Sequence, residues 1–471
     1  MREPESRDTP RAGQRRQQDL KQENGYRYEE SFLHIWAPAI TDYVEWVLEK
    51  AVRSGKKRLY FLARDGWMMY HAAQRIIDKR MLDIEISYLK VSRYAIRSAQ
   101  YYLLGEKSLD LICIGGIDVT FERIMKRALL TDEEAKHVAR IAGYEDRYDT
   151  VLNYRQIQEL KQQLKDVKIL FKYIEQHSKI NYENAVGYLR QEGLMEDKPY
   201  ALVDSGWIGT LQMSIQYLLS AEAGQERRIY GYYYGLYDVP KDAEGGQYES
   251  YYFGKKSVWK KVYFSNCLFE TVFSSPGGMT IGYEKRDDKY QAVESDRKNP
   301  NKELMLEFKS LLMMYVDERL RNKAASHINC IEKAEEYEKV PDLHERKSMA
   351  PGESSIHVCD KFRHKNNKRL ARLMSNPTPE EAEAYGSMKF CDDIIEFKLQ
   401  HVATEWDAKE LKKQSFVNKM LIKLNIKKEE LHDSAWPEGS IANYGSRVGY
   451  HLWQERLYKL FMYTRKAILG R

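Results

Sequence analysis

The chain has 471 residues, of which 43% are hydrophobic and 31% charged, a composition typical of a folded globular protein. Its net charge of +6 is small for this length, and we expect no nucleic-acid partner. The five cysteines form no CxxC pair, which indicates reduced thiols. No apolar leader and no run of about 18 apolar residues is present, so we expect a cytoplasmic protein without a membrane span.

The first strand and helix signals follow a polar N-terminal segment. Residues 1–25 contain almost no large apolar side chain, and we expect a disordered tail there. Apolar residues then recur at three- and four-residue steps over 31–52, which predicts a helix. The run RLYFLA at 58–63 predicts a buried strand, followed by a polar turn and a helix. A second strand is predicted at 84–91, again followed by a helix.

The pattern between about 116 and 195 is helical throughout, and we interpret it as an insertion. A third strand is predicted at 200–203 and a fourth at 228–237. Strands separated by helices pair in parallel. We therefore predict an α/β fold, a three-layer domain with a mostly parallel sheet, over residues 26–280.

Residues 281–471 are predicted to form a mainly α-helical C-terminal region. A hairpin is predicted at 279–293, at the start of this region. A long charged helix is predicted at 302–338 and a loop-like stretch at 341–365. Further helices are expected to begin near Pro379 and after Pro437.

Three polar segments stand where predicted strands end. They are residues 64–67 after the first strand, 92–93 after the second and 204–210 after the third. In open α/β sheets, ligands bind outside the carboxyl ends of the strands. The third segment also places glycines and a threonine before a helix, whose free amide groups attract an anion such as phosphate.

These segments supply candidate residues for chemistry at one site. Asp65 and Asp204 are the candidate catalytic residues, and two carboxylates beside one phosphate also suit Mg²⁺. The candidate substrate-binding residues are Arg64, Gly66, Ser92, Arg93, Ser205, Gly206, Trp207, Gly209 and Thr210. The alternative for an Asp or Ser at a strand end is the N-cap of the next helix, and Trp207 also suits core packing.

Five segments also indicate a family. LYFLARDGWMMYHAAQRI, YLKVSRYAIR, ALVDSGWIGTLQMSIQYLL, NPTPEEAEAYG and AWPEGSIA occur in this order over about residues 30–445. They resemble a module at the C-terminal side of predicted HAD-superfamily hydrolases from bacterial surface-polysaccharide gene clusters. The resemblance implies a cytoplasmic bacterial hydrolase or transferase of surface-polysaccharide biosynthesis, acting on a phosphorylated sugar or nucleotide-sugar and partnering glycosyltransferases. The DxD segment of HAD enzymes is not found, since Gly206 stands two residues after Asp204.

Two alternatives stay open beside this reading. A charged glycine turn after one strand and DSGWIGT after a later strand resemble the plan of type I phosphoribosyltransferases, although only Asp204 matches their acidic pair. A phosphoribosyltransferase-like enzyme is therefore the first alternative. The second is a non-catalytic module that docks glycosyltransferases through surfaces rich in tyrosine.

Overall fold

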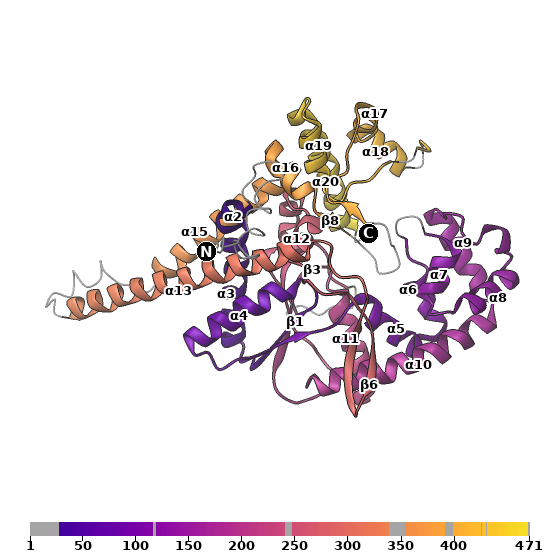
Figure 1. Cartoon of the computed structure of the whole chain (residues 1–471), viewed down its shortest axis with the longest axis horizontal. Coiled ribbons are helices and arrows are strands. Elements are labelled where there is room, and N and C mark those ends of the chain that lie inside the picture. Colours follow the sequence, from indigo (N-terminus) through magenta and orange to yellow (C-terminus); the bar gives the residue numbers. More distant parts are fainter. Residues whose placement is uncertain are drawn as a thin grey trace, which may run out of the picture.

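The computed structural model describes residues 28–115, 119–240, 247–338, 354–390, 399–424, 426–429 and 431–469, without the side chains of 323–338, 354–362 and 466–469. The tail predicted over 1–25 lies outside the described residues. At the centre is a five-stranded parallel sheet with helices on both faces (Figure 1). The predicted α/β class with a mainly helical C-terminal region is confirmed.

The central sheet has the strand order β2-β1-β3-β4-β5, with every neighbouring pair parallel. The strands are β1 (Arg58–Leu62), β2 (Glu85–Leu89), β3 (Tyr200–Trp207), β4 (Gly231–Leu236) and β5 (Tyr248–Phe253). The chain moves outward from β1 to β2 and then returns across β1 to β3. A ligand crevice is expected outside the carboxyl ends of β1 and β3, where the strand order reverses.

Two details of the sheet differ from the sequence prediction. β3 continues to Trp207 instead of ending at Val203, so Asp204 pairs with Tyr233 within the sheet. The strand β5 was not predicted, because Glu249 and Ser250 interrupt its apolar pattern. It lies at an edge of the sheet, where a strand has a neighbour on one side alone and an apolar run is not required.

Alternating side chains of the strands build the two outer layers. Leu59 and Phe61 pack into one apolar cluster, whereas Tyr60 and Leu62 pack into another on the opposite face. The first layer contains α3 (Ala37–Arg53), α4 (Gly66–Arg80), α12 (Asn266–Phe273) and α13 (Lys302–Glu338). The second layer contains α5 (Arg93–Leu104), α10 (Lys168–Gln191) and α11 (Thr210–Ala223).

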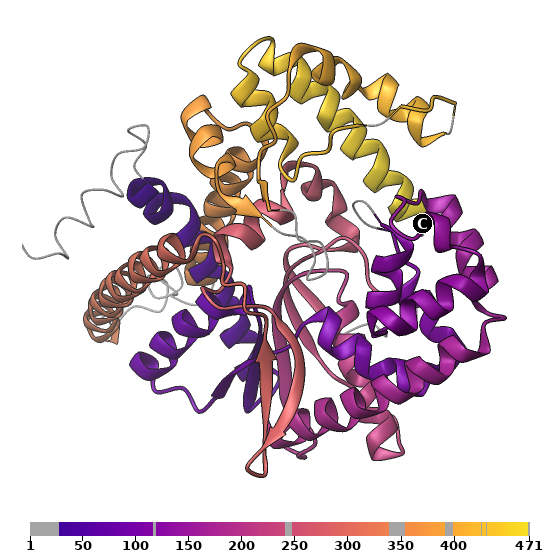
Figure 2. The same cartoon turned by 45° about the vertical axis from the view of Figure 1, so that its right-hand side comes forward.

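The helices between α5 and α10 lie beside the sheet (Figure 2) and have an apolar core of their own. This core contains Phe121, Leu160 and Leu170, all fully buried. The insertion predicted at about 116–195 also included the second half of α10, which packs on the sheet instead. The elements between α5 and α10 are η2 (Gly105–Ser108), α6 (Leu109–Ile112), α7 (Phe121–Arg127), α8 (Asp132–Ala142), η3 (Glu145–Arg147) and α9 (Tyr154–Leu164). Thr131 is the N-cap of α8, since its side-chain oxygen accepts a hydrogen bond from the backbone N–H of Glu134.

The β-hairpin predicted at 279–293 is present, and it lies beside α10. It consists of β6 (Thr280–Arg286) and β7 (Lys289–Glu294), which pair antiparallel. Asp287 and Asp288 form its turn with φ angles of 46° and 60°. Positive φ at both central residues defines the type I′ turn that hairpins prefer, and Asp tolerates it better than most residues other than glycine.

The C-terminal helices pack onto the first layer of the α/β part. Leu370, Tyr385 and Trp436 belong to the same apolar cluster as Leu59 of β1. The elements are η4 (Lys255–Tyr263), α15 (Ser354–Ser375), α16 (Pro379–Gly386), α17 (Ala408–Lys413), α18 (Phe416–Lys423), α19 (Pro437–Tyr444) and α20 (Val448–Leu469), with α2 (Tyr28–Ser31), η1 (Phe32–Trp36), β8 (Lys389–Phe390) and β9 (Gln400–His401) completing the fold.

Two further expectations concern this region. The loop-like stretch predicted at 341–365 is wrong from residue 354 onward, where α15 begins, and residues 341–353 lie outside the described chain. The helix was not predicted because basic and amide residues interrupt the apolar spacing of α15. No helix of the described residues is long and apolar enough to cross a lipid bilayer.

Candidate functional site

The polar segments at the carboxyl ends of β1, β2 and β3 meet at one edge of the sheet. They surround a pocket of about 180 Å³. All predicted site residues except Gly66 line this pocket, from Arg64 and Asp65 after β1 through Ser92 and Arg93 to Thr210. The pocket therefore lies at the β1/β3 switch point, where the parallel topology places a ligand site.

Asp65 does not cap the helix that follows it, which was the alternative role predicted for this residue. It precedes α4, but its side chain makes no capping hydrogen bond. Instead, one carboxylate oxygen of Asp65 accepts a short hydrogen bond from Oγ of the buried Ser205. This contact joins the segment after β1 to β3 across the pocket. Gly66 begins α4 and packs against the backbone of Phe61 instead of lining the pocket.

Ser92, in contrast, has a structural role. Its hydroxyl accepts a 3.0 Å hydrogen bond from the backbone N–H of Ala95 and so caps α5. The same hydroxyl donates a 2.6 Å hydrogen bond to the carbonyl of Thr280 at the start of β6. These two bonds hold the hairpin and the start of α5 together, and the next residue, Arg93, is exposed on the rim of the pocket.

The two glycines of the third segment are required by packing and by backbone shape. Gly206 has a φ of 136°, and a Cβ there would lie 2.0 Å from the carbonyl oxygen of Gly235 on β4. Gly209 has a φ of 76° and occupies the N-cap position of α11. Two peptide bonds at the pocket are cis: the bond from Gly206 to Trp207 and the bond from Ala63 to Arg64. A side chain at either glycine would disturb the pocket wall, because an L-residue rarely adopts these angles.

Thr210 begins α11 and faces a basic side chain. Its hydroxyl accepts a 3.3 Å hydrogen bond from a guanidinium nitrogen of Arg97 on α5. The free amide groups at the start of α11 lie in the same wall of the pocket. The basic groups and helix end favour a negatively charged ligand on this side.

A third acidic residue, Glu270, was missed by the sequence analysis. It comes from α12 in the first layer and lines the pocket. Oε1 of Glu270 accepts a 2.6 Å hydrogen bond from the indole N–H of Trp207. Its one sequence signal is that it is the single charged residue of the apolar helix NCLFETVF. Tyr237 after β4 and Met279 before β6 also line the pocket and were not predicted.

Trp207 itself is a packing residue with one polar contact. Its indole is 8% exposed and stacks on Phe253 with the ring planes 12° apart. Phe269 meets the same ring edge-on. Core packing, the alternative given for this tryptophan, therefore describes its ring, while its N–H orients Glu270.

The three carboxyl groups influence one another's protonation. Burial and the charge of Asp65 raise the pKa of Glu270 to about 7, against the hydrogen bond from Trp207. Burial and then the charge of Asp65 raise the pKa of Asp204 well above its ordinary value. Burial also raises the pKa of Asp65, while the Ser205 hydroxyl and the charges of Arg64 and Arg93 act in the opposite direction.

The arrangement can hold an anion and move a proton. A magnesium ion at Asp65 and Asp204 stays a prediction, and the described residues contain no group of three His, Cys, Asp or Glu side chains placed to hold a metal. The fit is poor for a cation because Arg64 and Arg93 place positive charge beside Asp65.

Comparisons with other proteins add no family at this point. No protein-family model matches the chain, and no curated protein matches it.

Proposed function

We propose that the chain is an enzyme of bacterial surface-polysaccharide biosynthesis that transfers or hydrolyses a phosphoryl or glycosyl group of a phosphorylated sugar or nucleotide-sugar. The observation that carries the proposal is one pocket that combines Arg64 and Arg93 with Asp65, Asp204 and Glu270. The motifs at the strand ends resemble a module encoded in surface-polysaccharide gene clusters, and this resemblance suggests the pathway.

The phosphate of the ligand binds on the basic side of the pocket. Arg64 and Arg93 follow two neighbouring strands and can form charge-assisted, bidentate hydrogen bonds to phosphate oxygens. The first amide groups of α11 and the hydroxyl of Thr210 contribute neutral donors. An uncharged sugar lacks these contacts, so the phosphate is expected to dominate affinity.

Two carboxyl groups divide the proton transfer. Glu270 titrates near neutrality, where a general acid is most effective, and protonates the leaving group. Asp65, held by Ser205 and flanked by two arginines, is the base that activates the attacking hydroxyl. Asp204 favours its neutral form and donates a hydrogen bond to the substrate. A base and an acid on one pocket suit both transfer and hydrolysis.

Ligand binding tests the proposal through one arginine. We expect glucose 1-phosphate and UDP-glucose, measured by titration calorimetry, to bind the wild-type chain more tightly than glucose. Arg93→Gln should raise the Kd of both by about 10- to 100-fold, since a hydrogen bond to a charged group contributes roughly 1.5–3 kcal/mol.

The control is Arg53→Gln, which changes another exposed arginine, on α3 and outside the pocket lining. Its Kd values should equal those of the wild type. Equal binding of glucose and glucose 1-phosphate, or an unchanged Kd in Arg93→Gln, would contradict a phosphate site here.

A further inference from the structure

The last helix, α20, leaves a stripe of large apolar residues on its solvent side. A surface helix normally turns its apolar stripe toward the protein. On α20, large apolar residues recur at three- and four-residue steps along the solvent side: Tyr450 (54% exposed), Trp453 (52%), Leu457, Leu460 (46%) and Phe461 (40%). We call these five residues the outward stripe.

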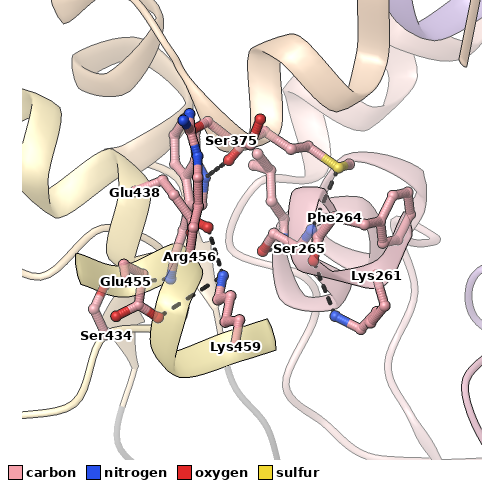
Figure 3. Close-up of polar contacts among 12 residues, drawn as sticks. Lys261, Phe264, Ser265, Ser375, Ser434, Glu438, Glu455, Arg456 and Lys459 are labelled. Carbon is pink, nitrogen blue, oxygen red and sulfur yellow. Dashed lines mark hydrogen bonds and ion pairs between the residues drawn. The ribbon is translucent and has the colours of Figure 1, made fainter. Parts of the chain in front are cut away.

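Three charged residues, Glu455, Arg456 and Lys459, lie on the inward face of α20 beside the buried Leu452 (Figure 3). Glu455 is 4% exposed and accepts a 2.6 Å hydrogen bond from Nζ of Lys419 on α18. Lys459 donates a 2.6 Å hydrogen bond to the fully buried Glu438 of α19. Arg456 donates to the carbonyl of Ser375 at the end of α15.

The inward ion pairs fix the rotation of the helix. Turning α20 to bury the outward stripe would withdraw Lys419 and Lys459 from their carboxylates and leave buried charges unpaired. Breaking a buried ion pair in this way is strongly unfavourable. The exposure of the outward stripe is therefore maintained by the rest of the fold, and exposed apolar patches of this kind mark an interaction surface.

The charges around the outward stripe identify what covers it. The helical turn η4 packs along α20 and contains four Lys and no acid. α20 contains four basic residues and one acid, Glu455, which is buried. The two elements together carry a net charge of +7, compared with +6 for the whole chain. Their exposed charged side chains, Lys255, Lys256 and Arg465, are all basic among the described positions.

We infer that α20 docks the chain onto an anionic lipid surface, with the outward stripe in the headgroup region. Tyr, Trp, Phe and Leu on one helix face beside basic residues are the composition of helices that lie in a membrane interface. A second copy of the same face would place like charges opposite each other, which disfavours a dimer. The helix lies in the interface and does not span the bilayer.

Docking would bring the pocket close to the membrane. Tyr463 on α20 contacts the ring of Tyr237 at 5.9 Å, and Tyr237 lines the pocket. The lipid interaction nevertheless uses residues outside the pocket lining, so it can be tested without any ligand of the pocket.

Vesicle sedimentation of the full chain tests the docking. In about 0.1 M NaCl, we expect binding to vesicles that contain phosphatidylglycerol and none to pure phosphatidylcholine vesicles. Trp453→Glu/Phe461→Glu should reduce binding at least about tenfold, because two apolar side chains that would be buried in the headgroup region are replaced by acids. Lys255→Glu/Lys256→Glu should reduce binding about threefold or more and weaken its salt dependence.

The matched control is Tyr154→Glu, which changes an exposed aromatic residue (71%) on the helical insertion and should leave vesicle binding unchanged. Each variant should unfold at the same midpoint temperature as the wild type, because the replaced side chains are exposed. This measurement checks that the variants are folded. Absence of wild-type binding, or equal binding by Trp453→Glu/Phe461→Glu, overturns the inference. A wild-type dimer that becomes monomeric in this variant also overturns it and identifies a second copy as the occupant.

Discussion

Two regions of this molecule withdraw carboxyl groups from water, and they differ in the donors that meet them. On α3, the fully buried Asp42 and Glu45 share the guanidinium of Arg319, with 2.6 Å between Nη2 and Glu45. Asn366 donates a 2.8 Å hydrogen bond to the second oxygen of Asp42. This cluster lies in the first layer, away from the pocket, and each negative charge has a cation in contact.

At the pocket, the donors in contact are neutral. Asp65 accepts from the Ser205 hydroxyl and Glu270 accepts from the Trp207 indole. Neutral donors compensate buried charge less well than a guanidinium does, so both carboxyl groups have a raised pKa. A buried carboxylate in contact with a cation therefore stabilises the fold, whereas one that contacts only neutral donors can exchange a proton near neutral pH.

The largest expected effect comes from changing the charge of Asp65. Asp65→Asn keeps the side-chain size and an acceptor for Ser205, but removes the proposed base. Turnover of glucose 1-phosphate or UDP-glucose should fall by about 10²- to 10⁴-fold. The free energy of unfolding, measured in urea, should not fall, because a partly compensated buried charge is removed. Full turnover would remove Asp65 from the proposed mechanism.

The same substitution in the paired cluster should give the opposite result. Asp42→Asn leaves Arg319 with one anionic partner and should lower the free energy of unfolding by about 3 kcal/mol or more. Urea denaturation measures this loss, and turnover below the transition should stay near the wild-type value. If Asp42→Asn and Asp65→Asn lose equal stability, the distinction between the two clusters is wrong.

The raised pKa of Glu270 makes stability depend on pH. Between about pH 4.5, its ordinary value, and pH 7, the folded chain keeps a proton that the unfolded chain releases. The free energy of unfolding should therefore fall as pH rises through this window, by at most about 3 kcal/mol from this group. Glu270→Gln should flatten the difference between pH 5 and pH 8 in urea. Glu318→Gln, on the exposed side of α13, should leave it unchanged.

The smallest expected effect comes from the donor to Glu270. Trp207→Phe keeps an aromatic ring against Phe253 but removes the indole N–H. Loss of this bond should raise the pKa of Glu270 further and shift the neutral limb of the pH–rate profile upward by about 0.5–1 unit. Stability should fall by about 1 kcal/mol.

Trp436→Phe is the matched control for this shift. Trp436 is also buried and donates its indole N–H, at 2.7 Å, to the carbonyl of Met374. It should lose similar stability without moving the pH–rate profile. An unshifted profile in Trp207→Phe would show that the indole does not tune Glu270.

Much of the site was predictable from short stretches of sequence. Apolar runs interrupted by Arg-Asp-Gly and Asp-Ser-Gly indicate strand ends, and parallel connections bring those ends to one edge. The pocket contains both aspartates and both arginines as expected. Asp204 was placed correctly at the edge but wrongly in a loop, because the strand continues past a polar residue that its neighbour β4 pairs.

Glu270 could not be assigned to the site from sequence. It stands 63 residues after Trp207 in a helix without a motif, and its position depends on how α12 packs beneath the sheet edge. The residues of α20 show the same limit. Leu452 and Phe461 both fit an inward apolar stripe by spacing, yet Leu452 is 1% exposed and Phe461 is 40% exposed.

Local sequence decides which segments become helices and strands here, because apolar spacing and turn residues act over a few neighbouring positions. It also decides that two acidic segments containing glycine lie at the carboxyl ends of parallel strands. Which groups meet depends on contacts between distant residues: Lys419 and Glu438 turn the charged face of α20 inward, and α12 brings Glu270 to Trp207. Those contacts form only in the packed chain, because they join residues that are distant in the sequence. Once formed, they resist a rotation of α20, because a buried carboxylate left without its lysine is strongly unfavourable.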